Sequence, residues 1–573
     1  MINQAPTADV PKLTHNEEIK AAIPTLAGSI AATCSDAAAD QFTPDDQQFL
    51  KFHGVYQQDD RDQRKIQKKF IMMARGRIPG GVMTSKQWLV FDELASKYGN
   101  NTLRITTRQS IQFHGIVLQN LRALVKGIHD SLLSTLAACG DVNRNVMAPP
   151  TPAYTAAREQ VFQQCHDVAM ALAPQTKAYH SIWIDGVQLK LDDVENQNFV
   201  DPLYGKSYLP RKFKVGFAIP PVNDIDVFTN DIGMIAIVEN EQVVGYNVIV
   251  GGGMGRSHGN EQTYPRLADL VGFITPDKLV DVAKAVLTIH RDFGDRTDRK
   301  HARLKYVVQE RGVEFMQREI EQRANVKLDS PRPFKFTTTG DLYGWRKQFD
   351  GKWFLGLFVE MGRVKDTEKI HLKTALRQVA HNFPDVEFRL SANQNVILAN
   401  VSDTDKEGID TLVNQHGVKT SEQASVLHAA AIACPALPTC GLSLSESERY
   451  LPGLIDRIER LCDEAGIGGE EIIIRMTGCP NGCARPYMAE IGFVGKAPGR
   501  YQLWLGGDTA GMRMNRLWKD VVKDAEMENE LRPLLTRYAK ERNPAERFGD
   551  WAARTVWNEI STASPKPTAV AAN

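Results

Sequence analysis

The chain has 573 residues, of which 42% are hydrophobic, and its 69 basic and 69 acidic side chains leave no formal net charge. This length predicts about three to four soluble domains, and the zero charge argues against a general nucleic-acid binder. No run approaches the roughly 18 apolar residues of a membrane-spanning helix. The first residues lack a basic stretch followed by an apolar one, so we expect no signal peptide, no membrane attachment and a cytoplasmic location.

The first part of the chain changes character near residue 53. Residues 1–52 are rich in Ala, Thr, Asp and Gln with weak periodicity, which predicts a mobile or partner-docking tail, with plain disorder as the alternative. Residues 69–77 then indicate a strand entering a loop. Residues 84–98 predict an amphipathic helix with Trp88 and Phe91 on its apolar side.

Residues 103–115 alternate apolar and polar side chains. This pattern predicts one half-buried strand on which Arg104 and Arg108 share a face, followed by Gln112 in the same alternation. The run that begins at Arg104 has a counterpart at Arg389, where Arg-Leu-Ser-Ala-Asn-Gln matches Arg-Ile-Thr-Thr-Arg-Gln at three positions. We interpret the match as an internal repeat of a strand–helix–strand half-domain, with chance similarity as the alternative. The second copy has Asn393 in place of Arg108.

Strands and helices mix throughout the remaining chain, which predicts an α/β (α+β) protein. We divide it into the tail at 1–52, half-domains at 53–130 and 335–410, and larger α/β domains at 145–330 and 425–560.

Four of the eight cysteines lie in two segments rich in Gly and Pro. Cys434 and Cys440 have five residues between them, whereas Cys479 and Cys483 have three, within Thr-Gly-Cys-Pro-Asn-Gly-Cys. Eight cysteines are too few for a disulfide scaffold of this length and suit a metal site in a reducing compartment. Zinc pairs usually have two to four intervening residues and often include His, so the spacing favours an iron–sulfur cluster over zinc.

Six motifs together resemble one family. They are the cysteine segments, Arg75-Gly-Arg-Ile-Pro-Gly-Gly, Arg104 to Gly115, Asn143-Arg-Asn-Val, Leu209-Pro-Arg-Lys-Phe-Lys and Gly251-Gly-Gly. In their order along the chain, with the cysteine segments last, they resemble the sirohaem- and 4Fe-4S-containing sulfite and nitrite reductases over about residues 55–555, most closely the haemoprotein (beta) subunits of assimilatory NADPH-dependent enzymes. The resemblance implies a pseudo-twofold fold with two ferredoxin-like half-domains and two larger α/β domains.

The resemblance also implies the ligands of both cofactors. All four cysteines would bind the 4Fe-4S cluster, and Cys483 would also be the axial ligand of the sirohaem iron. The metal ligands are thus Cys434, Cys440, Cys479 and Cys483. The cofactor contacts are Cys483, Arg104, Arg108, Gln112 and Asn481.

Four basic residues match the anion-binding positions of that family: Arg75, Arg144, Lys212 and Lys214. Lys212 and Lys214 alternate around Phe213, so both can face one site while Phe213 packs behind. Arginine suits bidentate binding of an oxyanion, and lysine suits proton donation. Taken singly, each of these residues would be interpreted as a solvated surface charge.

These features lead to a functional hypothesis. The resemblance implies six-electron reduction of sulfite to sulfide for cysteine biosynthesis. The run from Gly251 to Gly255 lacks the third glycine of a dinucleotide loop, so we expect the electrons to come from a separate protein. The resemblance implies that this protein is an NADPH-oxidising flavoprotein alpha subunit, in a hetero-oligomer. One alternative is a sirohaem nitrite reductase. In the ferredoxin-dependent nitrite enzymes, the position that corresponds to Lys214 resembles Asn rather than Lys. The others are a ferredoxin-dependent sulfite reductase and a cluster protein that only senses redox state or carries electrons.

Overall fold

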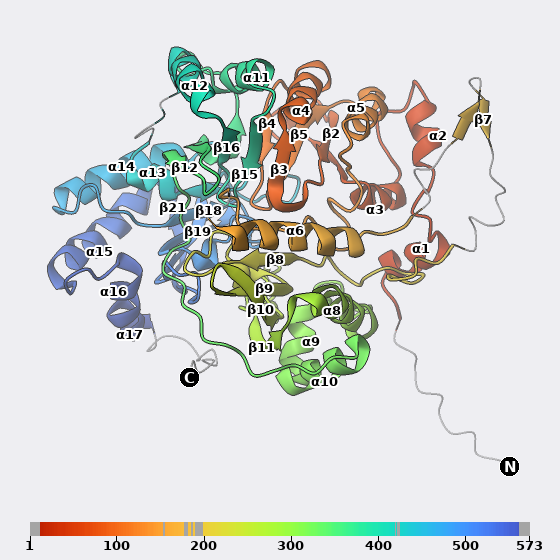
Figure 1. Cartoon of the computed structure of the whole chain (residues 1–573). Helices are drawn as coiled ribbons and strands as arrows, with labels where there is room; N and C mark the ends of the chain where they lie inside the picture. Colours follow the sequence, from red (N-terminus) through yellow and green to blue (C-terminus); the bar gives the residue numbers. More distant parts are fainter. Residues whose placement is uncertain are drawn as a thin grey trace.

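The computed structural model describes residues 12–152, 155–176, 199–418, 420 and 424–560, together with the backbone of 182–184 and 187–189. Within these residues the chain forms four sheets of four or five strands, and a two-stranded pair, β6 (Ile182–Ile184) and β7 (Val187–Leu189). Two of the large sheets lie in the upper part of Figure 1 and two in the lower part.

The two upper sheets carry the internal repeat. The first has the strand order β1-β2-β5-β4-β14, and the second has the order β12-β13-β16-β15-β3. Strands of the first sheet are β1 (Val55–Asp59), β2 (Phe70–Arg75), β4 (Leu103–Ile105), β5 (Ile111–Ile116) and β14 (Arg363–Val364). Strands of the second are β3 (Val82–Thr84), β12 (Gly344–Lys347), β13 (Trp353–Leu357), β15 (Glu387–Leu390) and β16 (Val396–Val401).

Each half of the repeat lends a short strand to the other. β14 belongs to the second half but pairs with β4, and β3 belongs to the first half but pairs with β15. Helices α4 (Ser85–Tyr98) and α5 (Leu118–Asp130) cover the first sheet, and α11 (Leu372–Asn382) and α12 (Asp403–Gln415) cover the second. Trp88 and Phe388 stack at 4.5 Å between ring centroids, so one core spans both halves.

The repeated segments are hairpins, and this corrects the expectation of a single strand. β4 and β5 pair antiparallel around a turn at residues 106–110, as β15 and β16 do around residues 391–395. Gln109 and Gln394 both have positive φ, at 50° and 74°. Arg108 therefore lies in a turn and does not share a strand face with Arg104.

The two larger sheets also share one plan. β8 (Val215–Ala218) pairs parallel with β9 (Ile232–Glu239), and β10 (Gln242–Val250) and β11 (Asp269–Ile274) continue the sheet antiparallel. In the same way β18 (Ile474–Thr477) pairs parallel with β19 (Ile491–Ala497), followed by β20 (Arg500–Leu505) and β21 (Arg516–Lys523). The short β17 (Ile432–Ala433) adds to β18 in parallel.

Helices complete both larger units. Around the β8–β11 sheet they are α6 (Ala156–Ala171), α8 (Leu279–Phe293), α9 (Leu304–Arg311) and α10 (Val313–Ala324). Beside the β17–β21 sheet they are α13 (Val426–Ala430), α14 (Leu451–Glu464), α15 (Met527–Glu541), α16 (Phe548–Arg554) and α17 (Val556–Ile560). No helix in the described residues is both long and apolar enough to cross a membrane.

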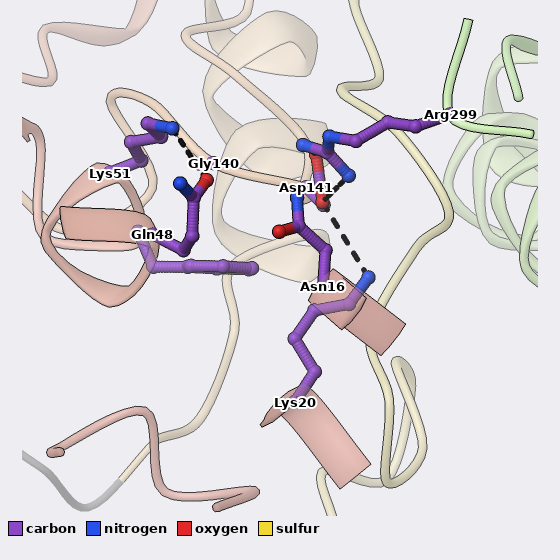
Figure 2. Close-up of a pocket in the computed structure, with 8 residues that line it drawn as sticks. Asn16, Lys20, Gln48, Lys51, Gly140, Asp141 and Arg299 are labelled. Carbon is purple, nitrogen blue, oxygen red and sulfur yellow. Dashed lines mark hydrogen bonds and ion pairs between the residues drawn. The ribbon is translucent and has the colours of Figure 1, made fainter. Parts of the chain in front are cut away.

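The N-terminal segment is folded where the sequence predicts a mobile or partner-docking tail. Residues 12–52 form α1 (His15–Ala22), α2 (Ile30–Ser35) and α3 (Pro44–Phe52), while residues 1–11 lie outside the described residues. Lys20 of α1 is 2% exposed, donates to Glu17 at 2.5 Å and lies 3.5 Å from Asp141, which Arg299 also holds (Figure 2). These buried ion pairs attach the segment to the body of the protein. A docking role for it stays a prediction.

Candidate cofactor and anion site

The sheet topology brings the two cysteine segments together. Cys434 directly follows β17, and one residue separates Cys479 from the end of β18. Ala433 pairs with Met476 in the parallel ladder, so the two cysteine segments leave the sheet at the same edge. Burial raises the pKa of Cys434, as do the nearby Cys483, Cys479 and Cys440. The four predicted ligands therefore form one cluster of thiols.

The loops around these thiols supply hydrogen bonds to sulfur. The backbone N–H of Gly478 donates to Cys434 Sγ at 3.3 Å, and Asn481 Nδ2 donates to Cys479 Sγ at 3.5 Å. Four thiols on two loops, with donors to two of the sulfurs, are a ligand set that fits an iron–sulfur cluster.

The predicted basic residues meet through an unexpected backbone pairing. Residues 143 and 147 form parallel bridges to residues 213 and 216, so the segment of Arg144 runs beside that of Lys212 and Lys214. Phe213 is fully buried between the two lysines and stacks on His290, as the alternation predicts. The pairing makes one basic surface from two separate motifs.

Burial strongly affects the charge of this surface. Burial, followed by the neighbouring Arg211 and Arg303, lowers the pKa of Lys212 to about 7, while Cys483 and Arg144 lie close enough to affect it as well. Burial and Arg108 lower the pKa of Lys214 well below its usual range. Lys212 therefore lies close enough to Cys483, the cysteine assigned to both cofactors, for their charges to interact.

Several of these cations have no partner within the described residues. The side chains of Arg75, Lys212 and Lys214 make no hydrogen bond or ion pair there, and Arg144 donates only to carbonyl oxygens, at 2.9 Å to Gly140. The Nε atoms of Arg75 and Arg108 and both amide atoms of Asn143 are buried without a partner. Buried donors left unpaired are costly, so these residues fit a polyanionic macrocycle and an oxyanion bound among them.

The remaining predicted cofactor contacts differ in how many of their side-chain donor atoms are already bound to protein groups. Arg108 donates to Asn230 Oδ1 at 2.8 Å and to two carbonyl oxygens, and Gln112 Nε2 lies 3.4 Å from Met73 Sδ. Arg104 is fully buried, and each of its three nitrogen atoms donates to another protein group. Its assignment as a cofactor contact stays a prediction.

Two site residues are absent from the sequence-based set. Arg211 has no hydrogen bond or ion pair within the described residues, and burial lowers its pKa to about 10. Its position beside Lys212 is the only sequence signal for it. Lys305 Nζ donates to the carbonyl oxygens of Gly253 and Gly255 at 3.3 and 2.8 Å. Nothing in its sequence surroundings marks it.

The glycine run at 251–253 is required by packing. A Cβ atom on Gly252 would lie 2.1 Å from the carbonyl oxygen of Phe228, and one on Gly253 would lie 2.9 Å from Arg303. These glycines let the chain pass between β9, β10 and the arginine that holds Asp231.

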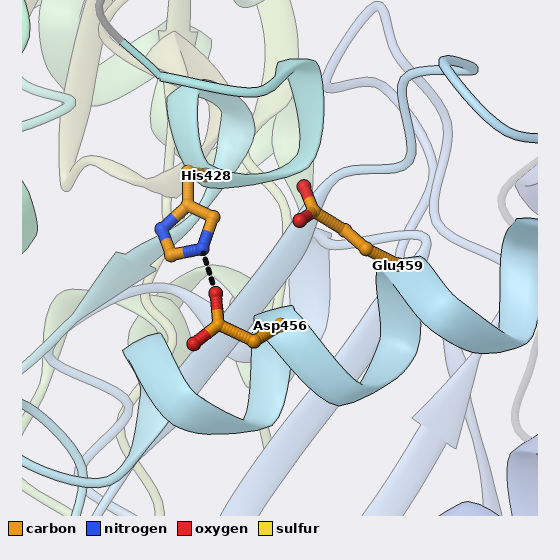
Figure 3. Close-up of side chains that lie close together, drawn as sticks. All are labelled: His428, Asp456 and Glu459. Atoms are coloured by element: carbon orange, nitrogen blue, oxygen red, sulfur yellow. Dashed lines mark hydrogen bonds and ion pairs between the residues drawn. The ribbon is translucent and has the colours of Figure 1, made fainter.

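One group with metal-ligand spacing lies elsewhere. His428 Nε2 of α13 lies 3.0 Å from Asp456 Oδ1 of α14, with Glu459 one turn further along that helix (Figure 3). Both carboxylates are near solvent, where such groups are common without an ion. We assign no metal to it.

Two family models match the chain. The model described as nitrite/sulfite reductase ferredoxin-like half domain matches residues 63–131 and 346–416. It confirms the internal repeat. The model described as nitrite and sulphite reductase 4Fe-4S domain matches residues 167–328, which include Lys212 and Lys214 but end before the four cysteines.

Curated relatives match along almost the whole length. The sulfite reductase (NADPH) hemoprotein beta-component of Staphylococcus saprophyticus is 48% identical, over 95% of this chain and 96% of that protein. The protein of the same name from Shouchella clausii is 46% identical, over 96% of each chain. Among solved structures, the Mycobacterium tuberculosis NirA protein has a TM-score of 0.77 and 22% identity, over 95% of this chain and 96% of that one. That likeness shows the fold alone, and it confirms the predicted fold class.

Proposed function

Because the chain belongs to the nitrite and sulfite reductase family, we propose that it reduces sulfite to sulfide as the haemoprotein component of an NADPH-dependent sulfite reductase. The observation that carries this proposal is the set of cations without partners in the described residues, of which Lys212 lies close enough to Cys483 for their charges to interact. An electron-carrying or redox-sensing protein needs only the four cysteines. A reductase of a small oxyanion also needs positive charge where the oxyanion binds.

The residues have distinct roles in this proposal. Cys434, Cys440, Cys479 and Cys483 would hold a 4Fe-4S cluster, and Cys483 would also bind the sirohaem iron. The two cofactors would supply the electrons and the iron at which sulfite is reduced. The predicted contacts to its periphery are Arg104, Arg108, Gln112 and Asn481. Among these, Arg108 has a buried Nε atom without a hydrogen-bond partner, and this atom can donate to a carboxylate of the macrocycle.

The basic residues act on the oxyanion. Arg75 and Arg144 bind and orient its oxygens, since a guanidinium pairs with an oxyanion in a fixed geometry. Lys212 and Lys214 supply protons. Reduction of one sulfite consumes six electrons and six protons and yields sulfide and three waters, so each departing oxygen requires two protons. A lysine whose pKa is about 7 can release and regain a proton near neutral pH.

The electrons come from a second protein in this proposal. The relatives are named as beta-components of an NADPH enzyme, and we assign the NADPH-oxidising role to a flavoprotein alpha subunit that assembles with this chain. Sulfide then serves cysteine biosynthesis. A ferredoxin donor is the alternative.

The first experiment separates this chain from its electron donor. Purified, sirohaem-loaded protein is supplied with reduced viologen, and kcat/KM is measured for sulfite and for nitrite. Sulfide formation with a clear preference for sulfite supports the proposal, whereas a strong preference for nitrite assigns the chain to the nitrite-reducing branch. Absence of turnover with both cofactors bound would contradict either reductase activity.

A further inference from the structure

Two arginines from the two halves of the repeat hold one carboxylate. Arg104 of β4 and Arg363 of β14 are directly opposed in the antiparallel ladder. Arg104 Nε donates to Glu448 Oε2 at 2.9 Å, while Arg363 donates to Oε1 at 2.7 Å and to Oε2 at 3.0 Å. Glu448 thus joins both half-domains to the segment that carries the cysteines. We call these three residues the triad.

The triad also holds the backbone on both sides of the first cysteine ligand. The N–H of Glu448 donates to the carbonyl oxygen of Cys434 at 3.1 Å. Arg104 Nη2 donates to the carbonyl oxygen of Ala433 at 2.8 Å, and Gln394 Nε2 donates to the same oxygen at 2.8 Å. The peptide groups that fix Cys434 are therefore positioned by the triad.

The triad carries one net positive charge in a buried place. Only 1% of the Arg104 side chain is exposed, and 12% and 13% of those of Arg363 and Glu448. Arg104 lies close enough to Cys434 for their charges to interact. Water screens a buried charge weakly, so its effect extends to groups bound at that cysteine.

We propose that Glu448 is a positioning residue for Cys434 and that the net positive charge of the triad raises the reduction potential of the bound cluster. Reduction by the donor removes one electron from the donor and adds one negative charge to the cluster. A nearby positive charge stabilises that reduced form. The inference rests on the proposed function, because it requires a 4Fe-4S cluster at the four cysteines.

The chain contains a matched control. Asp92 of α4 is held by Lys373 at 2.8 Å and by Arg377, both of α11, so it is also a buried carboxylate between two cations of the other half-domain. It lies on the helical layer, away from the cysteine segments. Loss of Asp92 tests the general cost of breaking such an arrangement.

Different substitutions separate the effect of the triad's charge from its effect on the position of Cys434. Glu448→Gln keeps the shape and raises the triad charge from one to two, whereas Arg363→Gln lowers it to zero. The double variant restores a charge of one. Glu448→Ala removes the side-chain contacts to both arginines and keeps only the backbone hydrogen bond to Cys434. Among the described residues Arg363 makes no hydrogen bond to Ala433 or Cys434 and reaches their segment only through Glu448, so its substitution changes the charge with little direct effect on the backbone at Cys434.

The potential is measured on the loaded protein by redox titration of the cluster signal in electron paramagnetic resonance. We expect a higher potential in E448Q, a lower one in R363Q, and a potential near that of the wild type in the double variant and in D92N. Shifts of the same sign in E448Q and R363Q, or none, would overturn the electrostatic part, because a purely structural disturbance has no reason to reverse sign.

Positioning is measured as iron loss to a chelator. We expect roughly tenfold or faster loss in E448A, with loss near the wild-type rate in E448Q and D92A. A wild-type rate in E448A would overturn the positioning role. If wild-type protein reconstituted with iron and sulfide shows no 4Fe-4S signal, the proposed function fails. A normal signal with unchanged potentials and rates contradicts only this inference.

Discussion

The backbone N–H of Arg144 donates to the carbonyl oxygen of Phe213 at 2.9 Å, and the N–H of Phe213 donates to the carbonyl oxygen of Val142 at 3.0 Å. These two bonds hold two predicted anion-binding motifs side by side. Because Phe213 is buried, its neighbours Lys212 and Lys214 remain on the side of the unpaired cations. The anion site is thus built on backbone hydrogen bonds as well as on charge.

Lys214→Asn is expected to shift preference from sulfite toward nitrite. Sulfite carries up to two negative charges and nitrite one, so loss of a cation weakens sulfite binding more. We expect the ratio of kcat/KM for sulfite over nitrite to fall by about tenfold, the value of one charge-assisted hydrogen bond. The measurement is viologen-driven turnover. The exposed Lys206→Asn serves as control, and an unchanged ratio in K214N would contradict the role of Lys214.

Gly478→Ala is expected to reduce cluster loading. A Cβ atom there would lie 2.1 Å from Ser443 Oγ, 2.4 Å from the carbonyl oxygen of Ser445 and 2.7 Å from Ala436 Cβ. The segment would have to move, and the hydrogen bond from residue 478 to Cys434 Sγ would be lost. We expect at least roughly twofold less iron and acid-labile sulfide per chain.

The other cysteine segment offers a control for that substitution. A Cβ atom on Gly441, directly after Cys440, would meet nothing within 4 Å. Gly441→Ala should therefore keep full iron content. Equal iron content in G478A and G441A would show that the close packing of Gly478 does not support the cluster.

Asp141→Asn is expected to destabilise the protein and weaken sulfite binding. Asp141 is buried, accepts from Arg299 at 2.7 and 2.9 Å and lies 3.5 Å from Lys20. The substitution therefore removes the negative charge that balances the positive charges of Arg299 and Lys20. Breaking such a buried pair costs about 3–5 kcal/mol. Residue 141 also precedes the segment that holds Arg144, so we expect a higher KM for sulfite.

Chemical denaturation and steady-state kinetics check this prediction. The control is Lys126→Ala, which removes an exposed ion pair with Asp130 and should cost less than about 1 kcal/mol. Equal stability losses in D141N and K126A would argue against a structural role for the buried network that attaches α1.

His290 is expected to make the protein sensitive to acid. Its ring is fully buried, contacts the carbonyl oxygen of Ala302 at 2.9 Å, and burial lowers its pKa to about 4 from 6.5. Between these values the unfolded state binds a proton that the folded state does not, so stability falls as pH falls from about 6.5 to 4. One such group accounts for about 2 kcal/mol between pH 8 and pH 5.

His290→Gln removes that proton uptake. Urea midpoints measured from pH 8 to pH 5 should fall less steeply in H290Q than in the wild type, whatever the change in absolute stability. The exposed His381→Gln should keep the wild-type slope. A wild-type slope in H290Q would show that other groups dominate the acid response.

The structure also shows why some sequence-based expectations were correct and others were not. The helix at 84–98 and the repeat were predictable, because apolar periodicity and a recurring motif are local signals. The hairpin at residues 103–116 was not, since its turn residues 106–110 contain no glycine or proline and the apolar residues on either side, at 103, 105, 111 and 113, keep one alternating phase. The folded state of residues 12–52 depends on Asp141 and Arg299, which lie far along the chain.

The sequence by itself determined the donor chemistry: four cysteines in two short segments, and arginines and lysines in motifs of one reductase family. Such features depend on residue type and close spacing. Only the tertiary structure decided which cations are free. Arg75 and Arg104 both lie in family motifs, on β2 and β4 of the same sheet, yet Arg104 pairs with Glu448 and Arg75 has no partner within the described residues. The reason is physical, because the partner of a buried charge comes from whichever distant segment the fold places against it.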